Sequence, residues 1–319
     1  MPYGHLRHSS RAAAAPHPPR PFHPPPRPAH SGLWPQCSVE PPPLCLGEAS
    51  DQGADIATLL AGKRALITAG ASGLGLSMAQ AFMAAGARVM VCDVDAAALI
   101  EAAGHCPGLA TALADVSAEG DVAQLFQAVD QRLGGLDVLV NNAGVAGPSC
   151  GVEAITLADW NRTLAVNLTG QFLCVREALP RLRAAQAQAQ CGGACIINLS
   201  SAAGHLGMPG RAAYSASKWA VVGFTQTLAL ELGPEGIRVN TILPGAVDGP
   251  RIRAVIAARA QATGLPVEEV ARAYTGQSAL GRLISPADIA HMAVFAASDW
   301  AAGVTGQSLV VDGLTQALS

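Results

Sequence analysis

The sequence contains no long apolar run. A membrane-spanning helix needs roughly 20 consecutive apolar residues, whereas every hydrophobic stretch in this chain of 319 residues is interrupted by glycine, proline or a charged residue. Strong positive charge is also missing, because the formal net charge is −3 and the basic residues of the globular part are scattered. We therefore expect a soluble protein with small-molecule partners, and neither a membrane nor a nucleic acid among them.

Paired cysteines are missing as well. The eight cysteines include no CxxC pair, and Cys191 and Cys195 have no histidine or second cysteine pair at zinc-ligand spacing. This pattern predicts free thiols in a reducing cytoplasm and no metal site. Charged residues make up only 13% of the chain and hydrophobic residues 50%, which favours an α/β protein whose sheet is buried on both faces.

The composition changes near residue 57. Residues 1–57 are rich in proline, arginine and histidine, and no acidic residue occurs before Glu40. Such a segment buries too little apolar surface to order itself, so we expect a disordered or misassigned N-terminal extension. A transit peptide is the alternative, although this density of proline prevents the amphipathic helix of such peptides. A proline-rich interaction arm is a third interpretation.

Residues 58–319 show short β-branched or apolar runs that alternate with helical stretches, a pattern typical of βαβ units. Right-handed crossovers place the helices on both sheet faces. The predicted fold is therefore α/β: a doubly wound, parallel seven-stranded sheet of Rossmann type in a single domain, with its ligand at the carboxyl ends of the strands. The predicted strands are residues 64–68, 88–92, 109–112, 136–140, 194–199, 237–242 and 308–311.

A glycine-rich turn follows the first predicted strand. Residues 68–75 read Thr-Ala-Gly-Ala-Ser-Gly-Leu-Gly and lead into a predicted helix. Gly70 and Gly73 can take backbone angles that other residues avoid, and Gly75 allows close approach of helix and strand. With Ser72 and Leu74 between them, these glycines predict a turn that places a dinucleotide pyrophosphate against the helix terminus.

The second predicted strand ends at Asp93, about 20 residues after the glycine turn, where a carboxylate can accept both ribose hydroxyls of adenosine. A 2′-phosphate would meet a like charge there, and no arginine or lysine directly follows Asp93. The pattern therefore favours NAD as the cofactor. Asp93 could instead cap a helix at residues 96–103, and the two interpretations are compatible.

Two further polar segments follow the third and fourth predicted strands. They are Asp115-Val116 and the run Asn142-Ala143-Gly144. Each is an ordinary turn sequence taken alone. Their occurrence after successive strands of one sheet favours contacts with the adenine and nicotinamide halves of the cofactor.

Tyr214 and Lys218 lie four residues apart on a predicted helix at residues 211–232, so both project from one helix face. An ammonium beside a phenol favours the phenolate, which predicts a proton-transfer pair. Lys218 is one of only two lysines. That scarcity suggests a need for a compact ammonium at this position, but a general bias toward arginine explains it equally well.

Residues 62–318 resemble a classical short-chain dehydrogenase/reductase. The resemblance implies an enzyme that interconverts a secondary alcohol and a ketone with NAD, in which Tyr214 is the general acid/base, Ser201 holds the substrate oxygen and Asn167 supports a proton relay to Lys218. It also implies cofactor contacts at Pro244, Gly245 and Val247, and a homodimer or homotetramer. The motifs that carry it are the glycine turn, Asn141-Asn142-Ala143-Gly144, Ser200-Ser201, Tyr214-Ser215-Ala216-Ser217-Lys218 and Pro244-Gly245.

Three positions depart from the family pattern. Ala69 stands where the family usually has glycine, and a methyl group fits there if the residue keeps a negative φ. Gly249 replaces a threonine that commonly bonds the nicotinamide carboxamide, so we expect the backbone of Val247 to serve alone. Leu314 occupies a place where a second glycine is frequent, which affects packing more than chemistry.

The substrate stays open at this stage. A predicted lid at residues 248–278 carries Arg251 and Arg253, either of which could bind an anionic substrate group; solvated arginines or contacts to cofactor phosphates are the alternative. His205 is a further candidate for the substrate pocket. A sugar or polyol, a 3-oxoacyl thioester, a hydroxysteroid and a small secondary alcohol all remain possible. A noncatalytic NAD-binding regulator is the competing class, and it predicts loss of Ser201, Tyr214 or Lys218.

Overall fold

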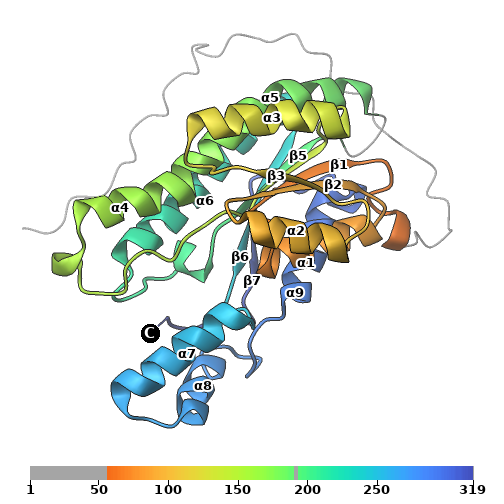
Figure 1. The fold of residues 1–319 in the computed structure, drawn as a ribbon. Coiled ribbons are helices and arrows are strands. Elements are labelled where there is room, and N and C mark those ends of the chain that lie inside the picture. The colour runs from red at the N-terminus through yellow and green to blue at the C-terminus, as the bar shows by residue number, and fades with distance from the viewer. Residues whose placement is uncertain (1–55, 190–192, 319) are drawn as a thin grey trace, which may run out of the picture. The chain divides into compact units, whose positions relative to one another are not determined.

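A single parallel sheet organises the part of the chain that the structure describes, which is residues 56–189 and 193–318 of a computed structural model (Figure 1). The strand order is β3-β2-β1-β4-β5-β6-β7, so the predicted doubly wound seven-stranded sheet is confirmed. Each strand lies within two residues of its predicted ends. The strands are β1 (Arg64–Thr68), β2 (Arg88–Asp93), β3 (Ala110–Leu113), β4 (Val138–Asn141), β5 (Cys195–Leu199), β6 (Arg238–Pro244) and β7 (Ser308–Val311).

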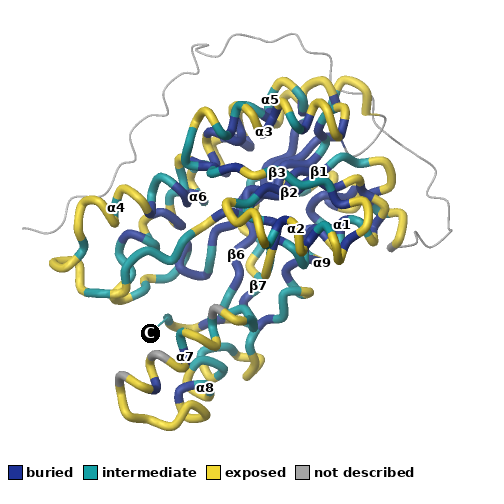
Figure 2. The backbone as a smooth tube through the Cα atoms, viewed as in Figure 1, coloured by how far each residue is buried: buried dark blue, intermediate teal, exposed yellow. Residues whose placement is uncertain are grey.

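Helices cover both faces of this sheet, with α1, α2 and α9 on one face and α3, α5 and α6 on the other (Figure 1). Strand β1 shows why, because its residues alternate between the two sides: Ala65 and Ile67 pack toward α1 and α9, and Leu66 packs toward α3 and α5. The central strands β1, β2, β4, β5 and β6 are accordingly deeply buried, whereas the edge strands β3 and β7 are partly exposed (Figure 2). The α-helices are α1 (Gly73–Ala84), α2 (Ala96–His105), α3 (Glu119–Leu133), α4 (Leu157–Leu164), α5 (Gly170–Gln188), α6 (Ala212–Leu232), α7 (Pro250–Thr263), α8 (Val267–Thr275) and α9 (Pro286–Ala297).

The predicted boundary at residue 57 falls inside a short helix, η1 (Ile56–Thr58). Leu60, just after it, is fully buried in the core with α1 and α9. Leu60 lies inside the predicted domain, and the boundary itself stays a prediction. The expected disorder of the preceding extension concerns residues 1–55, which lie outside the described residues.

The predicted lid consists of α7 and α8, separated by a break at residues 264–266 as the sequence suggested. The two helices follow β6 and pack against each other (Figure 1). Their contact is a small apolar cluster of Ile256, Ala260 and Val270, separate from the two main core clusters. The lid thus has its own packing, which suits a segment that closes over a ligand.

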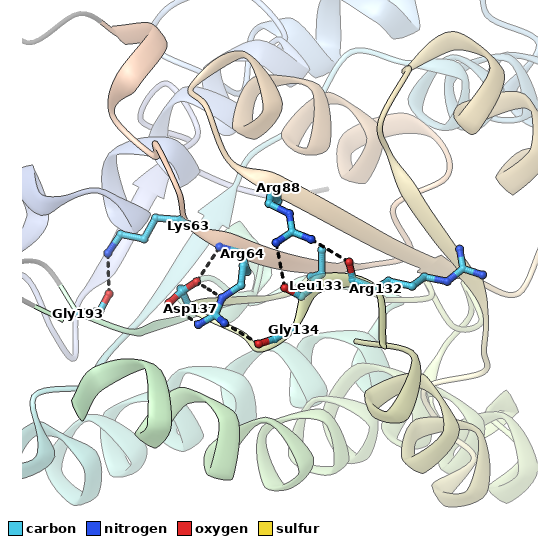
Figure 3. A network of polar contacts seen from close by, with 8 residues as sticks. All are labelled: Lys63, Arg64, Arg88, Arg132, Leu133, Gly134, Asp137 and Gly193. Atoms are coloured by element: carbon cyan, nitrogen blue, oxygen red, sulfur yellow. Dashed lines mark hydrogen bonds and ion pairs between the residues drawn. The ribbon is translucent and has the colours of Figure 1, made fainter. Parts of the chain in front are cut away.

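A network of basic side chains ties together the strands at their amino-terminal ends (Figure 3). Arg64 at the start of β1 donates Nε and Nη2 to the carboxylate of Asp137, at 2.7 and 3.1 Å, and Nη1 to the carbonyl of Gly134. Arg88 at the start of β2 bonds two carbonyl groups at the end of α3, and Lys63 bonds the carbonyl of Gly193. The basic side chains at the starts of β1 and β2 therefore have hydrogen-bond partners that hold this end of the two strands.

Within the described ranges, every helix is too short or too polar to cross a bilayer, and no cluster of metal-ligating side chains occurs. The described cysteines are unpaired. Burial raises the pKa of the Cys92 thiol to about 12 and also raises the pKa of Cys195. These two thiols are therefore packing groups and not nucleophiles.

Candidate active site

A cavity of about 650 Å³ opens at the carboxyl ends of β1, β4, β5 and β6. It is the position that a doubly wound sheet predicts for a ligand. The structure brings together here most of the residues that the sequence singled out. Those that line the cavity are Ser72, Gly73, Leu74, Gly75, Asn142, Gly144, Ser201, Tyr214, Lys218, Pro244, Gly245 and Val247.

Tyr214 and Lys218 project from α6 into this cavity, as their spacing predicts. The Lys218 side chain is almost completely buried, and its Nζ donates to the carbonyl oxygen of Leu199 at 2.8 Å. The same Nζ lies 5.7 Å from the centre of the Tyr214 ring. An ammonium held at this distance in a buried setting stabilises a negative charge on the phenol, which is what a proton acceptor requires.

Two neighbouring serines after β5 have different surroundings. The hydroxyl of Ser200 donates to the backbone carbonyl of Lys218 at 2.8 Å, so it fixes α6 against the end of the strand. Ser201 is partly exposed in the cavity, and among the described residues its hydroxyl has one hydrogen bond, accepted from the N–H of Ala203 at 3.2 Å. The Ser201 hydroxyl hydrogen is therefore available to a substrate oxygen, which agrees with the role that the sequence assigned to it.

Asn167 lies in η3 (Ala165–Thr169), a π-helical turn that joins α4 to α5. Its carboxamide is fully buried; Oδ1 accepts the N–H of Val145 at 2.7 Å and Nδ2 donates to the carbonyl of Val145 and to Ser217. A Cβ built on Gly144 would lie 3.3 Å from this Oδ1 and 3.4 Å from the Nζ of Lys218. Asn167 and the Lys218 ammonium therefore both lie close to Gly144; the relay itself stays a prediction.

The glycine turn has the geometry of a phosphate cradle. A Cβ on Gly75 would meet the carbonyl oxygen of Ala69 at 2.2 Å, so only glycine permits this approach of α1 to β1. Ser72, the N-cap of α1, makes no side-chain hydrogen bond to the first turn. The terminal N–H groups of α1 are thus left for an anion, and these residues fit the pyrophosphate of a dinucleotide. Gly70, outside the cavity lining, packs against Val91.

Ala69 does not have the negative φ that we expected to be needed for a methyl group to fit at this position. Its φ is 49°, in the left-handed region that disfavours residues with a Cβ. The conformation is held by Asn142, whose Nδ2 donates to the carbonyl oxygens of Thr68 and Ala69, both at 3.0 Å. The departure from glycine at this position therefore leaves strain in the cofactor turn.

Asp93 is hydrogen-bonded to the glycine turn: its Oδ2 accepts the N–H of Ala71 at 3.2 Å. The alternative role as a helix cap is wrong: Asp95 caps α2, accepting the N–H groups of Ala97 and Ala98. Asp93 does not line the cavity itself but lies at the end of β2, next to the glycine turn. That position is the one the sequence assigned to a ribose-binding carboxylate.

Asp115, Val116 and Ala143 also lie outside the cavity lining. Val116 is buried against Gly170, and Ala143 donates its N–H to the hydroxyl of Thr68. Partial burial disfavours the charged form of Asp115, but hydrogen bonds from Ser117 and the charge of Arg162 outweigh this and lower its pKa. Asp115 is thus an ionised carboxylate at the end of β3, where the adenine end of a dinucleotide was expected.

The chain after β6 presents backbone groups to the cavity. Val247 pairs with Ile284 in a parallel bridge whose hydrogen bonds come from Ala246 and Asp248, so the N–H and C=O of Val247 face the other way. Val247 also lines the cavity, which fits the expected backbone contact to a carboxamide. Gly249 is extended, with φ 165°, and its missing Cβ would meet nothing within 4 Å.

The three substrate candidates from the sequence are not brought together. His205 is absent from the cavity lining and turns its Nε2 toward the buried Asp312, at 3.8 Å. Arg253 is exposed on α7 and donates Nε and Nη2 to Asp248, both at 3.1 Å, so it is paired within the lid. This pairing raises the pKa of Arg253 and lowers that of Asp248. Arg251 lies on α7, but its side chain is outside the described part of the structure.

The sequence analysis missed Arg211, which lines the cavity one helical turn before Tyr214. The signal was present, because residues three apart on a helix share a face. It also missed large side chains that line the cavity, which come from the loop before α6, the lid and the C-terminal segment and have no common motif. These are Met208, Ile252, Val255, Tyr274 and Leu318.

Comparison with known proteins agrees with this geometry. A family profile described as Enoyl-(Acyl carrier protein) reductase matches residues 68–313. A trans-4-hydroxycyclohexanecarboxylate dehydrogenase of Sinomonas cyclohexanicum is 38% identical over 80% of this chain and 93% of its own. A 3-alpha-(or 20-beta)-hydroxysteroid dehydrogenase of Mycobacterium tuberculosis is 39% identical over 81% and 91%. The crystal structure of a 3-ketoacyl-(acyl-carrier-protein) reductase from Brucella melitensis complexed with NADH is 33% identical, with a TM-score of 0.71, and the match covers 80% of this chain and 98% of that one.

Proposed function

Because the chain belongs to the short-chain dehydrogenase/reductase family and is an oxidoreductase acting on CH–OH groups, we propose that it interconverts an alicyclic secondary alcohol and its ketone with NAD as cofactor. One observation carries the proposal: Ser201, Tyr214 and Lys218 line the same cavity as the glycine turn. The convergence also argues against a noncatalytic NAD-binding regulator, for which none of these three groups is needed.

The chemistry of the site follows from its own residues. Ser201 donates its hydroxyl hydrogen to the substrate oxygen and holds it beside the phenol. In oxidation the Tyr214 phenolate accepts the hydroxyl proton, and Lys218 stabilises that phenolate beforehand. When bound, the nicotinamide supplies the other half of the reaction, accepting the carbinol hydrogen with its electron pair as hydride. The products are the ketone, the reduced cofactor and a neutral tyrosine; reduction reverses each transfer.

The substrate class is supported by the relatives and by the cavity. Both relatives described above are named for hydroxyl groups of alicyclic compounds, a cyclohexanecarboxylate and a steroid. The apolar side chains of Met208, Ile252 and Val255 close the substrate end of this cavity. Such a lining favours a hydrocarbon ring over a polyol, whose many hydroxyl groups would lose their hydrogen bonds to water.

The choice of NAD is supported by Asp93. Its carboxylate stands at the end of β2 beside the glycine turn, where it would accept the ribose hydroxyls and repel a 2′-phosphate. The reductase that this chain resembles in structure is described as complexed with NADH. We expect Asp93→Ser to lower kcat/KM for NAD by about 10-fold or more and to raise that for NADP, as loss of a charged hydrogen-bond acceptor implies.

We also propose a homodimer or homotetramer in a reducing compartment such as the cytoplasm. Apolar side chains exposed on α5 and α6, at Phe172, Trp219 and Leu230, support self-association. The unpaired cysteines of the described residues support the compartment. Light scattering after gel filtration tests the oligomer, and Trp219→Lys is expected to shift it toward a monomer; a monomeric parent protein would refute the proposal.

A substrate panel tests the enzyme function. The full chain is assayed with cyclohexanol, galactitol and a 3-hydroxyacyl thioester, following the absorbance of NADH and, in parallel, of NADPH. We expect the highest kcat/KM for cyclohexanol with NAD. Turnover of only the polyol or only the thioester would overturn the substrate class, and preference for NADP would overturn the cofactor assignment.

A further inference from the structure

Arg211 is the one guanidinium among the described side chains that line the cavity. It stands at the N-cap of α6, three residues before Tyr214 and seven before Lys218. At that spacing the three side chains share one face of the helix. The face thus carries a buried ammonium at its inner end, the reactive phenol in the middle and a partly exposed guanidinium at its outer end.

The hydrogen bonds of Arg211 are one-sided. Nη1 donates to the carbonyl oxygens of Ala146 and Gly147, at 3.2 and 3.4 Å. Within the described residues, Nε and Nη2 have no hydrogen-bond acceptor, and Arg211 takes part in no ion pair. The group is therefore fixed in orientation on one edge and retains on the other the two parallel N–H donors that bind a carboxylate in a bidentate manner.

The other charges at the cavity do not neutralise Arg211. Lys218 bonds to Leu199 at the inner end, next to the phenol. Asp248 is the carboxylate in the cavity lining, and both of its oxygens accept hydrogen bonds from Arg253. The outer part of the cavity, as far as the side chains are described, therefore has an uncompensated positive charge beside apolar walls. An anionic group on an otherwise apolar ligand is the natural complement.

We propose that Arg211 is a specificity-determining residue that binds a carboxylate of the substrate, and that the substrate is an alicyclic hydroxy acid. Three residues on a helix correspond to about 4.5 Å along its axis, so the carboxylate lies across the ring from the hydroxyl group at Tyr214. This inference rests on the proposed function and narrows its substrate class. It takes the place of Arg253, which is paired with Asp248 within the lid, as an anion-binding candidate.

Matched substrates test the inference. We compare 4-hydroxycyclohexanecarboxylate with its methyl ester, which has the same ring and hydroxyl but no charge. The parent protein is expected to show a kcat/KM about 30-fold higher for the acid, the effect of a charge-assisted pair. Equal values for the two substrates would overturn the inference while leaving the proposed function intact.

Variants separate recognition from a purely structural role. Arg211→Gln is expected to raise KM for the acid about 30-fold and to change KM for the ester less than threefold, whereas Arg211→Lys, which keeps the charge, gives an intermediate KM for the acid. Arg272→Gln on α8, which removes a lid charge that does not line the cavity, leaves both substrates unchanged. If Arg211 only supports the loop at residues 146–147, the acid and the ester lose activity equally, and that result refutes the proposal.

A binding measurement keeps the test independent of turnover. Calorimetric titration of cyclohexanecarboxylate, which has no hydroxyl group to oxidise, is carried out on the parent protein and on Arg211→Gln in the presence of NADH. We expect about 10-fold or greater weakening of binding in the variant. Equal affinities would overturn the role of Arg211 even if the enzyme oxidises alcohols, and weakened binding without any turnover would overturn only the proposed function.

Discussion

The two ends of the sheet use the same kinds of residue in opposite ways. At the amino-terminal end, Arg64 directs donors to Asp137 and to the carbonyl of Gly134, and its pairing with Asp137 raises its pKa (Figure 3). At the carboxyl end, Lys218 faces Tyr214, and two donors of Arg211 have no acceptor among the residues that the structure describes. Paired cations hold strands together at one end of the sheet, whereas the cations at the other end line a cavity that can bind charge.

We expect the largest effect from a substitution at the carboxyl end of the sheet, at the proton-transfer residue Tyr214. Tyr214→Phe removes the group that exchanges the proton but keeps the ring, so kcat should fall about 10³-fold or more, or roughly 4 kcal/mol, while the free energy of unfolding changes little. The measurement is steady-state oxidation alongside urea unfolding of the same samples. Turnover of Tyr214→Phe at the parent rate would refute the assignment of the catalytic residue.

The next effect acts at the amino-terminal end. Asp137→Ala leaves the mostly buried guanidinium of Arg64 without its carboxylate, so we expect the free energy of unfolding to fall by about 2–3 kcal/mol. Because the cavity is at the other end, kcat/KM should stay within twofold. Glu235→Ala is the control, since its forked pair with Arg183 is exposed and should contribute about 0.5 kcal/mol or less. Similar losses in both variants would contradict the distinction.

We expect a smaller effect, on cofactor binding, from a substitution at Gly249. Gly249 is extended and its Cβ position is open, so Gly249→Thr should fold normally and add a hydroxyl beside the backbone of Val247. One added hydrogen bond of about 1 kcal/mol would lower KM for NAD roughly fivefold. An unchanged KM would show that the backbone contact already suffices. Thermal unfolding of the apoprotein, expected to be unchanged, is the control.

The smallest effect concerns strain at the carboxyl end. Ala69→Gly relieves a left-handed conformation that costs about 1 kcal/mol, and part of this gain is offset by the greater freedom of glycine in the unfolded chain. We expect a net stabilisation of about 0.5 kcal/mol, measured by urea unfolding. Leu314→Gly, at φ 60°, provides a second site with the same geometry outside the cavity lining. A loss of stability at Ala69→Gly would show that the turn is not strained.

The sequence was informative where chemistry and periodicity coincide. Short apolar runs between helical stretches predicted the position of each described strand, and the spacing of Tyr214 and Lys218 placed both on one helix face. It was less informative where a partner far along the chain decides the outcome. Nothing near His205 indicates that it turns toward Asp312. The cap of α2 was a miss of another kind, because Asp95 directly precedes the predicted helix and is a favourable N-cap residue by sequence.

The local sequence determined the secondary structure, the glycine turn and the residues capable of proton transfer. Each of these depends on residues close together in the chain: on their preferred backbone angles, on the spacing of their side chains along a helix or strand, and on their functional groups. Only the tertiary structure decided which arginines pair with a carboxylate. Arg64 and Arg253 do so, whereas Arg211 bonds only carbonyl groups among the described residues, although the three side chains are chemically identical. Whether a donor finds an acceptor depends on groups brought together from distant segments of the chain. The sequence alone therefore could not predict the role proposed for Arg211.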